Sequence, residues 1–189
     1  MNKKYKIGIF GSSAGDVETA AEKAEALGNE LSKYNVVVIT GACPGLPYTV
    51  AYATAKKGVE VWGFSPEINL ENQKKFTPET DSTIYKKLIY VPKNFSLVKN
   101  KMARKKYRNI ISTVTCDAGI IISGRWGTMN EFTNLYDMGK VIGILTGTGG
   151  IADEMPKLAK KIVKKSKAII IYDSSPENLI KKIIKTLKI

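Results

Sequence analysis

Apolar and polar positions follow two patterns along this chain, and the patterns alternate from one end to the other. Short runs dominated by apolar residues are typical of strands buried within a sheet. The strands predicted in this way are Tyr5–Phe10, Val36–Thr40, Val59–Gly63, Ile84–Val91, Gly119–Ser123, Val141–Thr146 and Ala168–Tyr172. None of these runs approaches the roughly 20 apolar residues that a membrane-spanning helix needs.

Between the apolar runs, apolar residues recur at the spacing of amphipathic helices. The first helix is expected behind a capping residue, Asp16, and its apolar stripe consists of Ala20, Ala24, Leu27 and Leu31. The later predicted helices begin at Pro47, cover Phe95–Thr115, Thr128–Met138 and Asp153–Ser166, and resume at Pro176.

The alternation of strands and helices predicts the fold class. It favours right-handed βαβ units, in which a parallel sheet carries helices on both faces. We therefore expect an α/β protein with a three-layer Rossmann-like domain and a mainly parallel sheet, with no domain boundary within residues 1–189. The polar segment Ser65–Thr83 interrupts the alternation and is expected to form a lid-like loop.

The segment from Asp117 to Glu131 carries the clearest functional signal. A predicted strand ends in the pattern Gly-x-x-Gly-Thr, and a helix follows at once. This order directs backbone N–H groups and the positive end of a helix dipole at one point, which suits an anion such as phosphate. The amides of Gly127 and Thr128 are the expected donors. Glu131, one turn further on, could act on the bound group, or it could serve only as a first-turn carboxylate that stabilises the helix.

Four glycine-bearing turns follow predicted strands and indicate a ligand crevice at one edge of the sheet. They are Gly11–Gly15, Gly41–Leu46, Gly124–Gly127 and Gly147–Gly150. The dinucleotide fingerprint is absent after the first strand, which reads Gly-Ser-Ser-Ala-Gly, and the P-loop pattern is absent too. NAD binding and ATP hydrolysis are therefore disfavoured.

Composition narrows the chemistry. The chain has no histidine, which excludes Ser-His-Asp and Cys-His nucleophile systems and zinc sites built on imidazole. The two cysteines, Cys43 and Cys116, lie in different predicted elements, so reduced structural thiols are expected. No signal-peptide pattern follows the N-terminus, and we expect a cytoplasmic protein.

The net charge of +13 raises the alternative of a nucleic-acid-binding protein. Much of the excess lies in amphipathic patterns after Lys157, where lysines would face water. Aromatic residues do not interleave with these lysines, as they would in a surface that binds single strands. A solvated lysine-rich face is the favoured interpretation, and nucleic acid is not expected as a partner.

The residues Gly124, Gly127, Thr128 and Glu131 match the pattern Pro-Gly-Gly-x-Gly-Thr-x-x-Glu, and on them the chain resembles the Lonely Guy family, once widely labelled "possible lysine decarboxylase". Arg108 matches an arginine that this family carries on the preceding helix. The first glycine-rich loop, Thr40–Leu46, and the opening Ile-Gly-Ile-Phe-Gly-Ser-Ser also fit. A decarboxylase finds no support, since no pattern indicates a pyridoxal phosphate site.

The resemblance implies a nucleoside 5′-monophosphate phosphoribohydrolase, which releases a free base and ribose 5-phosphate without a metal or cofactor. It assigns the catalytic roles to Arg108 and Glu131. It also implies a nucleotide ligand, held by Gly11, Ser12, Gly41, Gly45, Gly124, Arg125, Trp126, Gly127 and Thr128. A homodimer or higher even oligomer is expected, with Met102 and Tyr107 on the helix that bears Arg108 available for the contact.

Several positions depart from the family pattern. Arg125 stands where the family has its second glycine, and Ser123 replaces the proline. A side chain at position 125 could obstruct the approach of phosphate or supply a further cation to it. Cys43 and Pro44 replace glycines in the first loop. These changes resemble a nucleotide-binding, molybdenum-cofactor-carrier-like offshoot, so a non-catalytic carrier or sensor remains an alternative to the enzyme.

Some of the chosen residues also have structural interpretations. Arg108 lies among Arg104, Lys105 and Lys106 and could belong to a solvated face. Trp126 and Tyr48 could be core or interface aromatics rather than groups that stack on a base.

Overall fold

Parallel strands form one sheet in the computed structural model, which describes residues 4–12, 18–162 and 164–187. The strands are β1 (Tyr5–Gly11), β2 (Val36–Thr40), β3 (Glu60–Phe64), β4 (Lys87–Ile89), β5 (Ala118–Ile122), β6 (Val141–Leu145) and β7 (Ile169–Asp173). The described residues form a seven-stranded sheet in the order β4-β3-β2-β1-β5-β6-β7. Every neighbouring pair is parallel, and β2, β5 and β6 are buried along their whole length.

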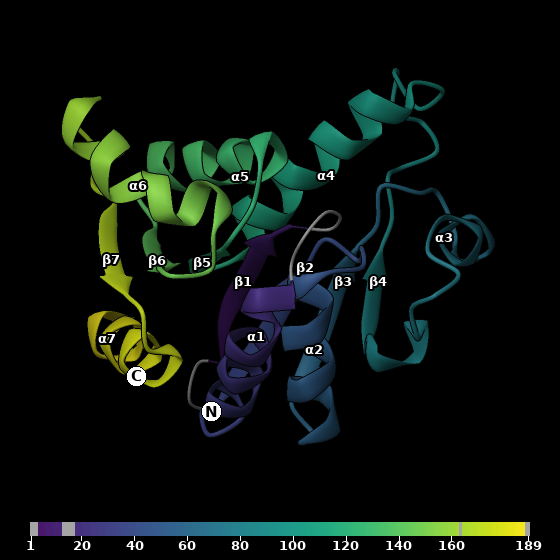
Figure 1. The fold of residues 1–189 in the computed structure, drawn as a ribbon. Coiled ribbons are helices and arrows are strands. Elements are labelled where there is room, and N and C mark those ends of the chain that lie inside the picture. Colours follow the sequence, from purple (N-terminus) through teal and green to yellow (C-terminus); the bar gives the residue numbers. More distant parts are fainter. Residues whose placement is uncertain (1–3, 13–17, 163, 188–189) are drawn as a thin grey trace.

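Helices cover both faces of this sheet (Figure 1). Helices α1 (Glu18–Leu31), α2 (Leu46–Lys56) and α7 (Pro176–Leu187) lie on one face. Helices α4 (Lys101–Thr115), α5 (Trp126–Asp137) and α6 (Gly150–Lys161) lie on the other. The short helices α3 (Leu70–Phe76) and η1 (Ser82–Ile84) connect β3 to β4 at the sheet edge. The three-layer Rossmann-like fold predicted from the sequence is confirmed.

Each face has its own hydrophobic core, because side chains alternate across every strand. On β1, Ile7 and Ile9 point to the α1–α2–α7 side, and Phe10 points to the other side. The apolar stripe predicted for α1 is fully buried in the first core. Burial of whole strands between two helical layers explains why their sequences are apolar throughout.

The order in which successive strands are added to the sheet reverses at β1. Strands β1 to β4 run outward to one edge, and α4 then carries the chain back so that β5 pairs with β1. In open parallel sheets, the carboxyl ends of the strands on either side of such a point border a crevice. Here these ends are Gly11 on β1 and Ile122 on β5, with Thr40 on the neighbouring β2.

Two connections differ from the sequence-based expectation. The helix predicted from Phe95 begins at Lys101, because the Asn100 side chain accepts hydrogen bonds from the amides of Met102 and Ala103 and caps it there. The segment Ser65–Thr83, expected as a loop, contains α3, which is capped by Asn69. Side-chain caps set where these helices begin, and the spacing of apolar residues does not reveal such boundaries.

Other boundaries shift by smaller amounts. The strand expected over Ile84–Val91 is only Lys87–Ile89, since η1 occupies its start. Helix α5 begins at Trp126 rather than Thr128, and α6 covers Gly150–Lys161 rather than Asp153–Ser166. The cap expected at Asp16 lies outside the described residues. In the described part of the chain, none of the helices has the length and apolar character that crossing a bilayer requires.

Candidate functional site

The carboxyl ends of β1, β2 and β5 border a cavity of about 170 Å³. Helices α4 and α5 close its other side. Its lining consists of Ile9, Phe10, Gly11, Ser12, Gly41, Cys43, Pro44, Pro47, Arg108, Asn109, Arg125, Gly127, Thr128 and Glu131. Eight of the sequence-predicted site residues, from four separate segments, are thus brought together here: Gly11, Ser12, Gly41, Arg108, Arg125, Gly127, Thr128 and Glu131.

Arg108 reaches this cavity from α4 and lies over the loop after β2. A Cβ atom built on Gly41 would stand 1.3 Å from Nη1 of Arg108, so the guanidinium occupies the space that any side chain at position 41 would need. The Nε atom of Arg108 is buried and has no hydrogen-bond partner among the described residues. Arg108 is therefore a half-buried cation that faces the cavity rather than part of a solvated surface.

Glu131 lies on the side of α5 that faces the cavity and is only 6% exposed. Burial raises the pKa of its carboxyl group to about 7, although the positive charges of Arg108 and Lys106 act in the opposite direction. No described residue forms a hydrogen bond or an ion pair with this carboxylate. A buried carboxyl group with a strongly perturbed pKa and no partner to neutralise it is typical of a functional site.

The N-terminus of α5 is open to the cavity. Arg125 takes the N-cap position, but its side chain forms no capping hydrogen bond. The space where a Cβ of Gly127 would lie is empty to 4 Å. The first-turn amides, including those of Gly127 and Thr128, thus begin a helix whose dipole favours an anion. The exposed side chain of Arg125 stands at the same place and adds a cation to it.

The turn before α5 is held in place from behind. Gly124 has φ of +102°, and a Cβ there would stand 2.6 Å from the Cβ of Thr128, so glycine is required. The hydroxyl of Thr148 accepts a hydrogen bond from the Ser123 amide at 2.8 Å, and the Ile151 amide donates to the Gly124 carbonyl at 2.9 Å. The loop after β6 therefore fixes the geometry of the turn that precedes α5.

Gly11 has a structural role as well as its place in the cavity, whereas Gly45, Gly124 and Trp126 do not line the cavity. A Cβ at Gly11 would stand 2.3 Å from the Ile122 carbonyl oxygen, so glycine there lets β1 and β5 approach closely. Gly45, with φ of +94°, is the N-cap of α2 and does not line the cavity. Trp126 does not line it either, but is 85% exposed beside a second cavity.

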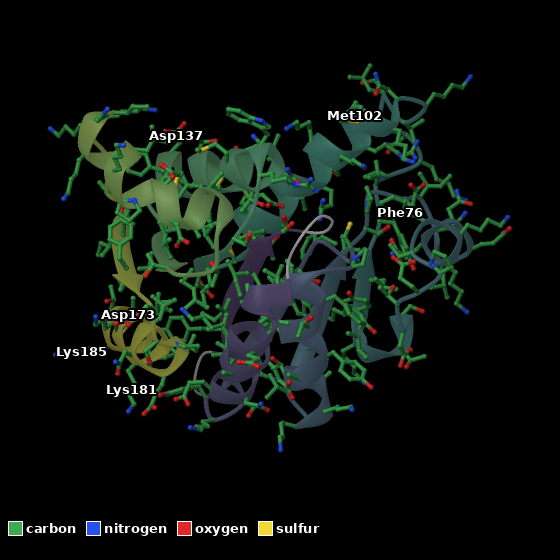
Figure 2. All side chains as sticks on the ribbon, in the orientation of Figure 1. Phe76, Met102, Asp137, Asp173, Lys181 and Lys185 are labelled. Atoms are coloured by element: carbon green, nitrogen blue, oxygen red, sulfur yellow. The ribbon has the colours of Figure 1, made fainter. Side chains whose placement is uncertain are left out.

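The second cavity, of about 470 Å³, adjoins the first and shares Cys43, Pro44, Arg108, Asn109 and Gly127 with it. Its further lining residues are Phe76, Thr77, Met102, Lys105, Lys106 and Trp126. Figure 2 shows Phe76 and Met102, which reach this region from α3 and α4. The lid-like segment thus contributes to the site through the C-terminal end of α3.

Asn109 and several other lining residues were not predicted from the sequence. Asn109 lines both cavities, and its buried Oδ1 atom has no partner in the described part of the chain. The sequence offered one indication that Asn109 belongs to the site, namely that it directly follows Arg108. Tyr85 lines neither cavity but is 9% exposed in the core, and its hydroxyl is likewise without a partner among the described residues. Burial raises the pKa of Tyr85, while the nearby Arg108 acts to lower it.

Cys43 lines both cavities, and burial raises the pKa of its thiol, with Arg108 opposing. Cys116 is buried in the sheet core, where burial raises its pKa to about 12. Both thiols are free. Over the described residues, no group of three or more Cys, Asp or Glu side chains could hold a metal ion.

Comparison with known proteins agrees with this geometry. The model of the SLOG cluster4 family matches residues 4–180, which is most of the chain. This match confirms the resemblance inferred from the glycine-rich turn and Glu131. A search of curated proteins finds no match.

Solved structures share the fold. The X-ray structure of TM1055 superposes with a TM-score of 0.77 at 19% identity, over 96% of this chain and 99% of that protein. The molybdenum cofactor binding protein of Rippkaea orientalis gives 0.69 at 19% identity, over 100% of both chains. DNA processing protein A of Helicobacter pylori, described for its single-stranded DNA binding mode, gives 0.67 at 18% identity, over 96% of this chain and 81% of that one. At such identities the likeness shows the fold alone.

Proposed function

The chain belongs to the SLOG cluster4 family, and from this membership and the geometry of the cavity we propose that it binds a nucleotide at the carboxyl ends of β1, β2 and β5. The phosphate would bind at the start of α5, where the amides of Gly127 and Thr128 and the Arg125 side chain converge on the cavity. The position at a topological switch point supports this, because ligands of open parallel sheets collect there.

We further propose that the nucleotide is a nucleoside 5′-monophosphate and that the protein hydrolyses its N-glycosidic bond. The observation that carries this proposal is the buried carboxyl group of Glu131, which lines the cavity and has no hydrogen-bond or ion-pair partner among the described residues. In its ionised form Glu131 would stabilise the oxocarbenium-like ribose and accept a proton from the attacking water. Water would add to C1′, the glycosidic bond would break, and the base would leave with its bonding electrons. Arg108 would stabilise negative charge on the phosphate or on the leaving base.

A non-catalytic carrier is the second candidate. Two features favour it: the exposed Arg125 where the family motif has glycine, and the larger second cavity beside the first. Because a molybdenum cofactor binding protein shares the fold, we propose that cofactor as the cargo in this case. Such a carrier would need the anion site but no cleavage of the ligand.

Incubation with AMP, GMP, CMP and UMP separates the two candidates. A hydrolase should release free base and ribose 5-phosphate, and Glu131→Gln should lower kcat by about 100-fold or more while the nucleotide still binds. Arg108→Ala should weaken both binding and turnover. If the wild type binds a monophosphate but releases no base from any of them, the hydrolase is excluded and the carrier takes its place.

The anion site can be tested by crystallisation from sulfate or phosphate. We expect an anion within hydrogen-bonding distance of the Gly127 and Thr128 amides. A protein side chain that fills this turn and leaves no room for an anion would contradict the proposal.

A further inference from the structure

The two cavities adjoin and share part of their lining, in which positively charged side chains outnumber negatively charged ones. They share Arg108, and each has further cations of its own: Arg125 lines the first cavity, and Lys105 and Lys106 line the second. Glu131, in the first cavity, is the only carboxylate among the described residues that line either one. Four positive side chains therefore face a single carboxyl group.

None of these four cations forms an ion pair with a described carboxylate. Arg104, on the same helix, provides the contrast, since its guanidinium pairs with Glu67 at 3.1 Å and both side chains are largely buried. The Lys105 ammonium group faces the Phe76 ring at 5.7 Å, and the Lys106 ammonium group contacts the amide oxygen of Asn130 at 3.5 Å. Both lysines thus remain available to a ligand in the second cavity.

A nucleoside monophosphate would not match this charge. One phosphate monoester carries a charge of about −1.5 to −2 at neutral pH. Arg125, Arg108 and the N-terminus of α5 already lie around the first cavity and suffice for a group of that charge. Lys105 and Lys106 would then be left without an anion in the second cavity.

We propose that the ligand carries a second phosphate, which binds in the second cavity beside Lys105 and Lys106. This inference rests on the proposed nucleotide site in the first cavity, but it replaces the nucleoside monophosphate by a nucleotide with a second phosphate as the preferred ligand and leaves AMP as a weaker one. Phe76 and Trp126 line the same cavity and add apolar surface to it.

Calorimetric titration of the wild-type protein with AMP, ADP and adenosine 3′,5′-bisphosphate tests the proposal. ADP places its second phosphate next to the first, whereas the bisphosphate places it across the ribose. At least one of the two should bind about ten-fold more tightly than AMP, as expected for an added charge-assisted contact. The tighter ligand then shows where the second phosphate is attached.

The charge dependence is tested with the double variant K105A/K106A. The ratio of the affinity for the two-phosphate ligand to that for AMP should fall close to one. The matched control is K157A/K160A, which removes the same charge from exposed positions on α6 and should keep the wild-type ratio. If AMP binds and neither two-phosphate ligand binds more tightly, the inference is wrong and the proposed nucleotide site stands. If none of the three ligands binds, both are wrong.

Discussion

Arg108 and Gly41 fit together so closely that the guanidinium lies where a side chain at position 41 would begin, 1.3 Å from an added Cβ. Gly41 does not have the positive φ that forces glycine at Gly45 and Gly124. The requirement for glycine at position 41 therefore comes from Arg108, which lies 67 positions later in the chain. The conformation of the loop after β2 and the direction of the Arg108 side chain depend on each other.

Gly41→Ala should displace Arg108 and weaken nucleotide binding by about ten-fold, the loss expected for one charged hydrogen-bonding group. Titration with AMP measures the effect. Ala42→Gly changes the same loop without adding an atom and should leave the affinity near that of the wild type. In an Arg108→Ala background the added methyl group meets no guanidinium, so Gly41→Ala should have little further effect. Equal effects in both backgrounds would contradict the steric relationship.

Glu131 should make the stability of the fold fall as the pH rises. Its pKa is about 7 in the folded protein, against an ordinary value of 4.5, so between these values the folded state holds the proton more tightly than the unfolded state does. Stability is therefore lost as the pH rises from 4.5 to 7, by up to about 3 kcal/mol. Glu131→Gln should remove this loss, so its Tm advantage over wild type should be larger at pH 8 than at pH 5. The exposed Glu154→Gln should show no such trend.

The same pKa predicts the pH dependence of base release. Only the ionised Glu131 carboxylate can stabilise an oxocarbenium ion or accept a proton from water. The value of kcat/KM for a nucleoside monophosphate should rise with pH and level off above about 7. A rate that is constant between pH 5 and pH 8 would show that another group performs this step.

Helix α4 is expected to form the contact in a homodimer. Met102, Ile110 and Val114 on this helix are 62%, 46% and 49% exposed, whereas the ring of Tyr107 packs against Phe95 at 4.9 Å and is less available than the sequence implied. Light scattering at micromolar concentration should give twice the 20.8 kDa chain mass or a higher even multiple. Ile110→Asp should produce a monomer, and the control Leu70→Asp, at an exposed residue of α3, should not. A monomeric wild type would refute this prediction.

Single-stranded DNA should not bind at physiological salt. The lysine-rich helices α6 and α7 lack the interleaved aromatic residues on which bases stack, and on α7 Lys181 pairs with Glu177 and Lys182 with Asp173. Figure 2 shows Asp173 at the end of β7 near Lys181 and Lys185 of α7. Fluorescence anisotropy of a labelled oligonucleotide checks this. Binding that persists at 0.15 M salt would favour the nucleic-acid alternative.

The sequence predicted the fold better than it predicted the site. Buried strands such as Val36–Thr40 and the stripe of α1 have patterns that depend on local spacing alone, and these were confirmed. The start of α4 was misplaced because Asn100 ends the preceding turn with a side-chain cap. The relationship of Arg108 to Gly41 and the position of Phe76 beside Lys105 depend on the folded topology. No pattern within a single segment could show them.

The pairing of β5 with β1 has a consequence for the order in which the protein folds as it is synthesised. Strands β1 to β4 emerge from the ribosome first and can pair among themselves, but one edge of β1 then has no neighbour until Ala118–Ile122 has been made. That edge is long and apolar, which makes it prone to pair with other chains. The nascent chain therefore passes through an aggregation-prone interval, in which this edge of β1 stays open until β5 pairs with it and β6 and β7 can follow.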